Sequence, residues 1–252
     1  MTYWDCFTFN IERECLQIRC EELKSLNPIH ILVDSNYSFT GKKQKVPFSE
    51  NDCEDYFCYN IFEYAVNDMP NNGNAWDNEI HQRNKILSAL EDLGAKDDDV
   101  VIVSDADEIP SLEAVKRYHS EMGISCLIMN MFYYYFNCIE SEQSWRSPKI
   151  MTYKLLKFLT PNIVRNGGQQ TEIANGGWHF SWLGDANKAI DKIKSFSHQE
   201  YNTPEISSEF IESKIKNCEN FMNNNKLKII SIDETFPSFL YTNQFKFKHL
   251  IK

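Results

Sequence analysis

The chain has 252 residues, with 26 basic and 36 acidic side chains and a formal charge of −10. This acidic balance argues against a nucleic-acid partner, because affinity for a phosphate backbone comes from Lys and Arg. The apolar share of 42% supports a sizeable core, and the length fits a single domain over residues 1–252. No signal peptide is evident, and no segment approaches the ~20 apolar residues of a membrane span.

The cysteines favour a reducing compartment. None of the eight forms a Cys-x-x-Cys pair, and several lie in runs typical of a buried strand or helix, as at Cys6, Cys15, Cys20 and Cys126. Small buried thiols of this kind do not predict a zinc or disulfide framework. We therefore expect eight free thiols and a cytoplasmic location.

The first elements of the chain predict a β-α-β unit. Residues 3–9 have the pattern of a strand, and residues 10–26 that of a helix. The buried face of this helix is expected to carry Leu16, Cys20 and Leu23. Residues 29–33 indicate a second strand, which leads directly into Asp34 and Ser35. A strand, a crossover helix and a second strand predict parallel pairing.

Another strand and helix follow. Residues 51–66 combine an acidic turn with an aromatic run that is expected to include a strand. Asp77 is positioned to cap a helix that Gly94 ends after residue 93. Arg83 lies on this helix, and an isolated arginine of this kind is more often a surface cation than a ligand.

An acidic turn comes directly after the strongest strand signal. Residues 100–103 are all β-branched, which is typical of a strand buried on both faces, and Asp105, Asp107 and Glu108 follow at once. In open α/β sheets, ligands bind at the carboxyl ends of the strands. An Asp-x-Asp pair offers oxygen ligands to a Mg²⁺ or Mn²⁺ ion that bridges a diphosphate. The alternative is a solvated turn, because Asp-x-Asp also occurs by chance.

The remaining elements have weaker signals. Residues 124–136 indicate a central strand, whereas residues 141–175 are interpreted as strands and loops. A helix is expected over residues 187–199, and another is expected to start at Thr203 and Pro204. Taken together, the elements predict an α/β fold with a mixed, mostly parallel central sheet flanked by helices.

A second unusual stretch is Gly-Gly-Trp-His-Phe-Ser-Trp at residues 176–182. Glycines allow the backbone to approach a ligand closely, and Trp178 and Trp182 bracket His179. A tryptophan face can stack on a sugar ring, so a sugar site is one interpretation. The other is a core strand with a glycine bulge.

Residues 104–111 (Ser-Asp-Ala-Asp-Glu-Ile-Pro-Ser) and residues 176–182 together resemble the two signatures of glycosyltransferase family 17. The start of the chain is also similar, in Asp5-Cys6-Phe7 with Asn10 and Glu12. Other similar segments are Asp34-Ser35-Asn36, Phe39-Thr40-Gly41, residues 194–198, and the tail around Tyr241, Asn243 and Phe247.

The resemblance implies a GT-A type nucleotide-sugar fold, an inverting mechanism, a UDP-sugar donor and a divalent cation, Mn²⁺ or Mg²⁺. The donor in the family's known activity is UDP-N-acetylglucosamine. The chain differs from the Golgi members in having no evident amino-terminal anchor and in having Asp34 in place of a glutamate. The missing anchor points away from a glycoprotein acceptor, and the tryptophans favour a saccharide.

Transfer requires an acceptor hydroxyl to attack the anomeric carbon while the nucleoside diphosphate leaves. The site must therefore stabilise the diphosphate and take up a proton. Asp107 is assigned to the metal, and Asp105 to the metal or the donor ribose. His179 is assigned to the metal or a phosphate, and the alternative is a structural histidine beside Trp178. Glu108 is the predicted base, and Asp185 is its rival.

Binding roles follow from the same resemblance. The residues placed at the nucleotide are Asn10, Glu12, Asp34, Ser35, Arg83 and Asp105. Those placed at the sugar or the acceptor are Trp178 and Trp182.

Two other classes of function are compatible with the pattern. A nucleotidyltransferase also uses paired aspartates and a metal, but it releases pyrophosphate instead of a nucleoside diphosphate. A non-catalytic sugar-binding module also uses tryptophans, but it does not turn over a UDP-sugar.

Overall fold

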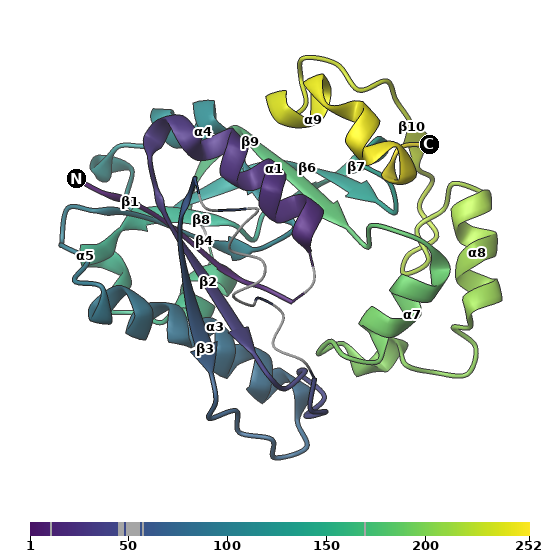
Figure 1. Cartoon of the computed structure of the whole chain (residues 1–252), viewed down its shortest axis with the longest axis horizontal. Coiled ribbons are helices and arrows are strands. Elements are labelled where there is room, and N and C mark those ends of the chain that lie inside the picture. Colours follow the sequence, from purple (N-terminus) through teal and green to yellow (C-terminus); the bar gives the residue numbers. More distant parts are fainter. Residues whose placement is uncertain (11, 45–47, 49–55, 57, 169) are drawn as a thin grey trace.

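A single mixed β-sheet runs through the protein, as the computed structural model shows (Figure 1). The structure describes residues 1–10, 12–44, 48, 56, 58–168 and 170–252. Four strands form the parallel part of the sheet in the order β3-β2-β1-β4. Their bounds are β1 (Tyr3–Thr8), β2 (Ile29–Ser35), β3 (Asn60–Val66) and β4 (Val100–Asp105). The predicted α/β fold with a largely parallel sheet is thereby confirmed.

The other part of the sheet is mainly antiparallel. β8 (Lys149–Thr152) pairs antiparallel with β4 and joins it to β6 (Ser125–Tyr133). Further along its length β6 pairs antiparallel with β7 (Cys138–Trp145), which pairs with β10 (Lys228–Ile229). β9 (Thr171–Ser181) runs parallel to β6, and the short β5 (Glu108–Pro110) pairs antiparallel with β9.

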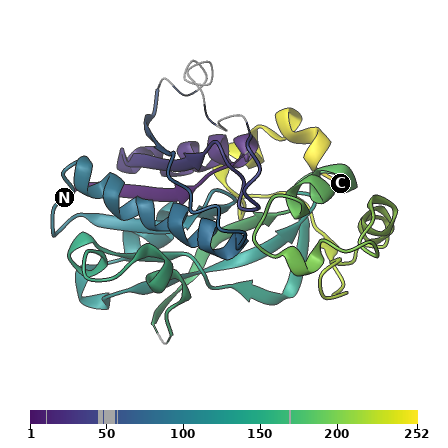
Figure 2. The same ribbon diagram turned by 90° about the horizontal axis from the view of Figure 1, so that it is seen from below.

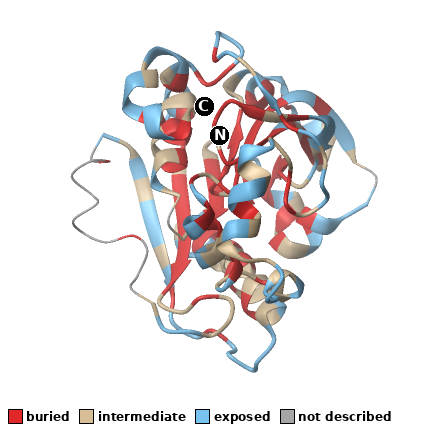
Figure 3. Ribbon diagram, turned by 90° about the vertical axis from the view of Figure 1, so that its right-hand side faces the viewer, coloured by how far each residue is buried: buried red, intermediate tan, exposed pale blue. Residues whose placement is uncertain are grey.

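Helices cover both faces of the central strands β1 and β2, whose alternate residues point to opposite sides, whereas most residues of the edge strand β3 are exposed or half-buried. Cys6 and Ile31 pack against α3 (Ala75–Asp92) on one face. Phe7 and Leu32 pack with the residues of α1 (Arg13–Leu23) on the other face. Figure 2 shows α3 lying across the strands, and Figure 3 shows the strands between the helices coloured as buried.

The remaining helices extend this arrangement. α5 (Tyr153–Leu156) and α6 (Pro161–Asn166) lie on the same face as α3, because their apolar residues join the same cluster. α7 (Ala186–Ile193) packs on α8 (Ser208–Lys216) beside the ends of β6 and β9. The other helical segments are α4 (Leu112–Arg117), α9 (Ser238–Thr242), and the 3-10 turns Lys24–Leu26, Ser120–Met122, Gln199–Tyr201 and Gln244–Leu250.

Several predicted boundaries were wrong for identifiable reasons. Residues 141–175 contain two short helices, α5 and α6, in addition to strands. α3 is capped by Asn74, whose side chain accepts a hydrogen bond from the backbone N–H of Trp76, so Asp77 is not the cap. The helix expected from Thr203 begins after Ser207 instead, because the Ser207 hydroxyl caps the N–H of Phe210.

The expectation of free thiols is met by the seven cysteines that the structure describes, and Cys53 lies outside the described residues. Within the described part of the chain, no helix has the length and apolar character needed to cross a membrane.

Candidate active site

A cavity of about 390 Å³ opens at the carboxyl ends of β1 and β4. Its size lies within the range usual for small-molecule sites. The strand ends and adjoining turns contribute Thr8, Asn10, Glu12, Asp105 and Asp107 to its lining. The opposite walls contribute Trp76, Glu79, Arg83, Trp145, Arg165, His179, Trp182, Lys192 and His198. The acidic turn therefore opens into a cavity and is not merely solvated.

The two unusual stretches of the sequence meet at this cavity. β5 pairs with β9, so that Glu108 lies opposite His179. The backbone N–H of Phe180 also donates to the carbonyl of Asp107 over 2.9 Å. The side chains of Asp107 and His179 are brought together by this pairing, with 3.5 Å between Oδ1 and Nε2.

A fully buried arginine holds the acidic turn against β1. Arg19, on α1, donates to both carboxylate oxygens of Asp5. The same guanidinium donates to the carbonyl oxygens of Asp105 and Glu108 over 3.1 and 2.8 Å, and to the Ser104 hydroxyl over 2.6 Å. Because one rigid group binds the backbone at both ends of the turn, it holds the turn against β1.

Asp105 is neutralised by two arginines. One oxygen accepts hydrogen bonds from Arg83 over 3.1 Å and from the Thr8 hydroxyl over 2.9 Å, and the other accepts from Arg165 over 2.6 Å. Burial alone would raise the pKa of Asp105, but the guanidinium groups of Arg165 and Arg83 outweigh it and lower the pKa to about 2. Asp105 is therefore a carboxylate at neutral pH.

Glu108 is fully buried, and four donors surround it. Arg165 donates to both of its oxygens, over 2.7 and 2.6 Å. The backbone N–H of Asp105 donates to Oε2 over 2.7 Å, and the indole N–H of Trp145 donates to Oε1. A carboxylate held in this way is shielded from the cavity, which argues against the predicted role of Glu108 as base.

Asp107 lies between an imidazole and an ammonium group. Its Oδ2 is 3.2 Å from Nζ of Lys192, and its Oδ1 faces His179, whose ring packs on Trp145 at 4.6 Å between centroids. Burial raises the pKa of Asp107, but Lys192 and then His179 outweigh it, so the pKa falls well below its usual range. Asp107 therefore presents a negative charge to the cavity.

The glycines of the second stretch allow close contact between strands. A Cβ on Gly176 would lie 2.5 Å from the backbone nitrogen of Ile128, and one on Gly177 would lie 2.0 Å from the carbonyl oxygen of Ile109. Gly177 also has a φ of 141°, in a region that favours glycine. The pairing of β9 with β6 shifts register between Leu127 and Met129. The structure thus supports the core strand with a glycine bulge.

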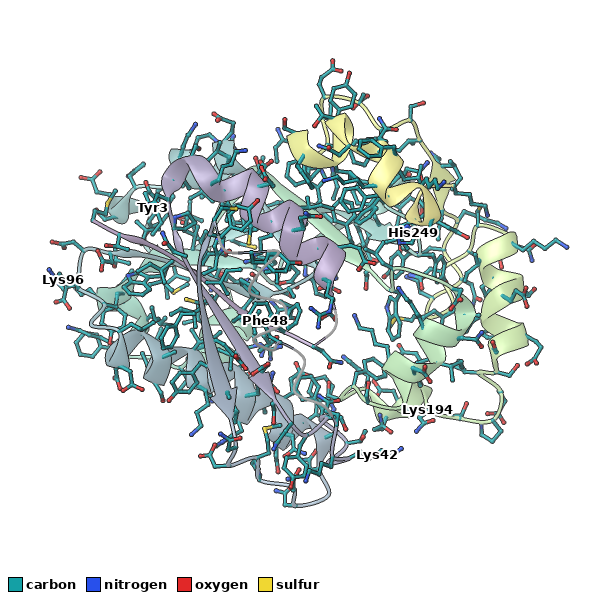
Figure 4. All side chains as sticks on the ribbon, viewed as in Figure 1. Tyr3, Lys42, Phe48, Lys96, Lys194 and His249 are labelled. Carbon is teal, nitrogen blue, oxygen red and sulfur yellow. The ribbon has the colours of Figure 1, made fainter. Side chains whose placement is uncertain are left out.

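Five of the predicted site residues do not line this cavity. Ser35 is buried and donates to the carbonyl of Val66, and Asp34 is buried and accepts from the backbone of Phe48, whose position under α1 is labelled in Figure 4. Trp178 is buried and donates its indole N–H to the carbonyl of Thr235. Asp185 caps α7 by accepting from the backbone of Lys188. The fifth is Glu108.

The cavity gathers the other predicted residues, which are Asn10, Glu12, Arg83, Asp105, Asp107, His179 and Trp182. The sequence interpretation missed several charged or aromatic side chains of its lining, among them Trp76, Glu79, Arg165 and Lys192. Arg165 lies on a helix that was not predicted, although Thr160 and Pro161 form the usual signal for a helix start. Lys192 lies on a predicted helix, but nothing in its neighbourhood distinguishes it from a surface lysine.

Asp107 and its neighbour His179 could bind a divalent cation that is also coordinated by groups of a substrate. Asp107 and His179 supply one carboxylate and one imidazole. Among the residues that the structure describes, no group of three or more His, Cys, Asp or Glu side chains could hold a metal ion. Mg²⁺ is usually bound by one or two carboxylates together with substrate phosphates. The residues present therefore fit a cation that is shared with a diphosphate.

Comparison with known proteins identifies the family of the chain. A family model described as glycosyltransferase family 17 matches residues 2–223, a range that contains every lining residue of the cavity. The tail around Tyr241, Asn243 and Phe247 lies outside the match. No curated protein matches the chain significantly. Because the model covers most of the sequence, the chain belongs to glycosyltransferase family 17.

Proposed function

We propose that this protein transfers N-acetylglucosamine from a UDP-sugar to a hydroxyl of a saccharide acceptor, with inversion at the anomeric carbon. Membership of a glycosyltransferase family suggests sugar transfer. The observation that carries the proposal is the meeting of Asp107 and His179, from the two stretches that resemble the family signatures, at the carboxyl ends of parallel strands. A GT-A type fold is part of this proposal, as is the donor used by the β-1,4-mannosyl-glycoprotein 4-β-N-acetylglucosaminyltransferase that these signatures resemble.

The leaving diphosphate sets the first chemical requirement. Asp107 and His179 would hold the divalent cation, which supplies Lewis-acid stabilisation of the leaving diphosphate when it is bound. Asn10 and Thr8, at the end of β1, and Arg83, on α3, are placed on the nucleotide side of the cavity. The arginines beside Asp105 offset its charge, so that the turn does not repel the nucleotide with full strength.

The acceptor hydroxyl sets the second requirement, a carboxylate within hydrogen-bond reach. Glu108 is enclosed by four donors, and Asp185 caps a helix outside the cavity. Besides Asp105 and Asp107, the carboxylates among the described residues that line the cavity are Glu12 and Glu79. We place the proton acceptor at one of these two, because a base must reach the proton that it removes.

An exposed tryptophan supports a saccharide acceptor. Trp76 lies at the cavity with 40% of its surface exposed and contacts His198 edge-on, at 4.4 Å between centroids. Trp182 also lines the cavity, but it makes T-shaped contacts with Phe196 and Phe221 and is only 7% exposed. Trp76 is therefore the most exposed of the tryptophans that line the cavity, and we place it at the sugar ring.

A thermal-shift panel of nucleotides and nucleotide sugars, with and without Mn²⁺, tests the proposal. Ligand at 100 times its Kd stabilises the folded state by about 2.7 kcal/mol, which corresponds to roughly 5–10 °C for a chain of this size. UDP and UDP-N-acetylglucosamine should give the largest shifts, and Asp107→Asn should abolish the dependence on Mn²⁺. Release of pyrophosphate would indicate a nucleotidyltransferase, and binding without turnover would indicate a sugar-binding module.

A further inference from the structure

Lys192 occupies a position that the proposed function leaves without a role. Its Nζ lies 3.2 Å from Oδ2 of Asp107 and 3.7 Å from Oε1 of Glu12, and it lies 5.3 Å from the centre of the Trp182 ring. The side chain is 29% exposed and lines the cavity. Its ammonium group thus contacts the carboxylate that is assigned to the divalent cation.

The distribution of charge makes this contact specific. The two arginines of the cavity, Arg83 and Arg165, both pair with Asp105. Among the ion pairs of the described residues, Lys192 is the permanently charged partner of Asp107, since the other partner, His179, is charged only when protonated. Asp107 is therefore balanced by one ammonium group on a flexible stem.

An ammonium group and a divalent cation compete for this carboxylate. Both are positive, so they repel each other at contact distance. The described residues do not include a third His, Cys, Asp or Glu ligand that would favour the divalent cation. A nucleoside diphosphate changes the balance, because its phosphates attract both cations and can accept hydrogen bonds from a lysine.

We propose that Lys192 blocks the divalent cation from Asp107 in the free protein and moves from Asp107 to the diphosphate when the nucleotide binds. The metal and the nucleotide then bind together, and neither binds well alone. The transfer of Lys192 to the phosphates rests on the proposed function, whereas its competition with a divalent cation does not.

The test measures Mn²⁺ and UDP binding separately. Free Mn²⁺ is titrated by electron paramagnetic resonance with the nucleotide-free protein, and UDP is then titrated by calorimetry at saturating Mn²⁺. The variants are Lys192→Met, which keeps the length of the stem without the charge, and Lys192→Arg, which keeps the charge. Lys194→Met is the matched control, because Lys194 directly follows the same helix and is exposed (Figure 4). Circular dichroism verifies that each variant is folded.

One substitution should change the two affinities in opposite directions. In Lys192→Met, Mn²⁺ alone should bind on the order of tenfold more tightly, and UDP with Mn²⁺ on the order of tenfold more weakly, within the usual range of coupling between two ligands. Lys192→Arg should bind Mn²⁺ alone as weakly as the native protein does. Lys194→Met should match the native protein in its affinity for both ligands.

Unchanged or weaker Mn²⁺ binding by folded Lys192→Met would overturn the competition, even if UDP binds and is turned over. Unchanged UDP affinity would overturn the movement of the lysine to the diphosphate. A native protein that binds no UDP with Mn²⁺ would overturn the proposed function and that movement together, while the Mn²⁺ titration would still decide the competition.

Discussion

Replacing Glu108 with glutamine tests whether this carboxylate has a structural role or acts as the catalytic base. Both oxygens of Glu108 accept two hydrogen bonds each, from the Asp105 backbone, Trp145 and Arg165. Glutamine keeps one acceptor oxygen but turns an NH₂ group toward two of these donors. Two hydrogen bonds to a charged group are lost, at about 1.5–3 kcal/mol each. We therefore expect Glu108→Gln to lower the free energy of unfolding by about 3–6 kcal/mol.

Urea unfolding followed by circular dichroism measures this loss, and the melting temperature should fall by roughly 10 °C or more. The matched control is Glu113→Gln, because Glu113 is 76% exposed and pairs only at the surface with Lys116. That change should stay within about 0.5 kcal/mol. The double variant Glu108→Gln/Arg165→Met should lose less stability than the two single variants lose in sum, because the ion pair is removed as a unit.

The opposite result would restore Glu108 as the base. If Glu108 is a general base, Glu108→Gln should stay within about 1 kcal/mol of the native stability while kcat falls by about 10²–10⁴-fold. Such a protein would contradict the role that we derive from the four hydrogen bonds.

Three further predictions address the acceptor, the pH dependence and the strand contact. Trp76→Ala should raise the acceptor KM about tenfold and leave the UDP Kd within about threefold, as steady-state kinetics and calorimetry would measure; an equal loss of UDP affinity would place Trp76 at the donor. Burial, with Glu63 nearby, raises the pKa of Asp34 to about 7, so the folded state holds this proton more tightly than the unfolded state and loses stability as the pH rises from about 4 through 7. Asp34→Asn should therefore gain in melting temperature relative to the native protein at pH 8 but not at pH 4.5, and parallel pH profiles would count against this. Gly177→Ala should prevent soluble folding, because its Cβ would lie 2.0 Å from a carbonyl oxygen, whereas Gly168→Ala, with no atom within 4 Å, should express and melt normally.

The parallel strands could be predicted from the sequence because their signal is local. In β4, Val101 and Val103 join one cluster, whereas Val100 and Ile102 join another, so the run is apolar throughout. Such a run indicates a doubly buried strand without knowledge of its partners. The acidic turn follows that strand directly, and its place at the edge of the sheet could therefore be inferred as well.

The roles of the individual side chains could not be predicted, because they depend on distant partners. Glu108 looks like a free carboxylate until Arg165, 57 positions later, is placed against it. Lys192 looks like a surface lysine until α7 brings it to Asp107, 85 positions earlier. Arg19 likewise lies in a helix, and nothing in its local sequence indicates that it is buried in an ion pair with Asp5.

Similar sequence patterns correspond to different structures at two places in the chain. Trp178 and Trp182 are four positions apart, which would place both on one face of a continuous strand, yet only Trp182 lines the cavity. The reason is that β9 ends at Ser181 and the backbone turns at Trp182, whose φ is 56°. Proline follows a capping residue both at Thr160, where α6 begins although no helix was predicted, and at Thr203, where the predicted helix does not begin. The cytoplasmic location stays a prediction.

Proton NMR of a reaction mixture tests the central claim most directly. The protein is incubated with UDP-N-acetylglucosamine, Mn²⁺ and a panel of saccharide acceptors, and Asp107→Asn serves as the inactive control. We predict that the native protein releases UDP and forms a β-linked product from the α-linked donor, as inversion requires. An unchanged donor with every acceptor, release of pyrophosphate, or equal turnover by Asp107→Asn would contradict sugar transfer at this cavity.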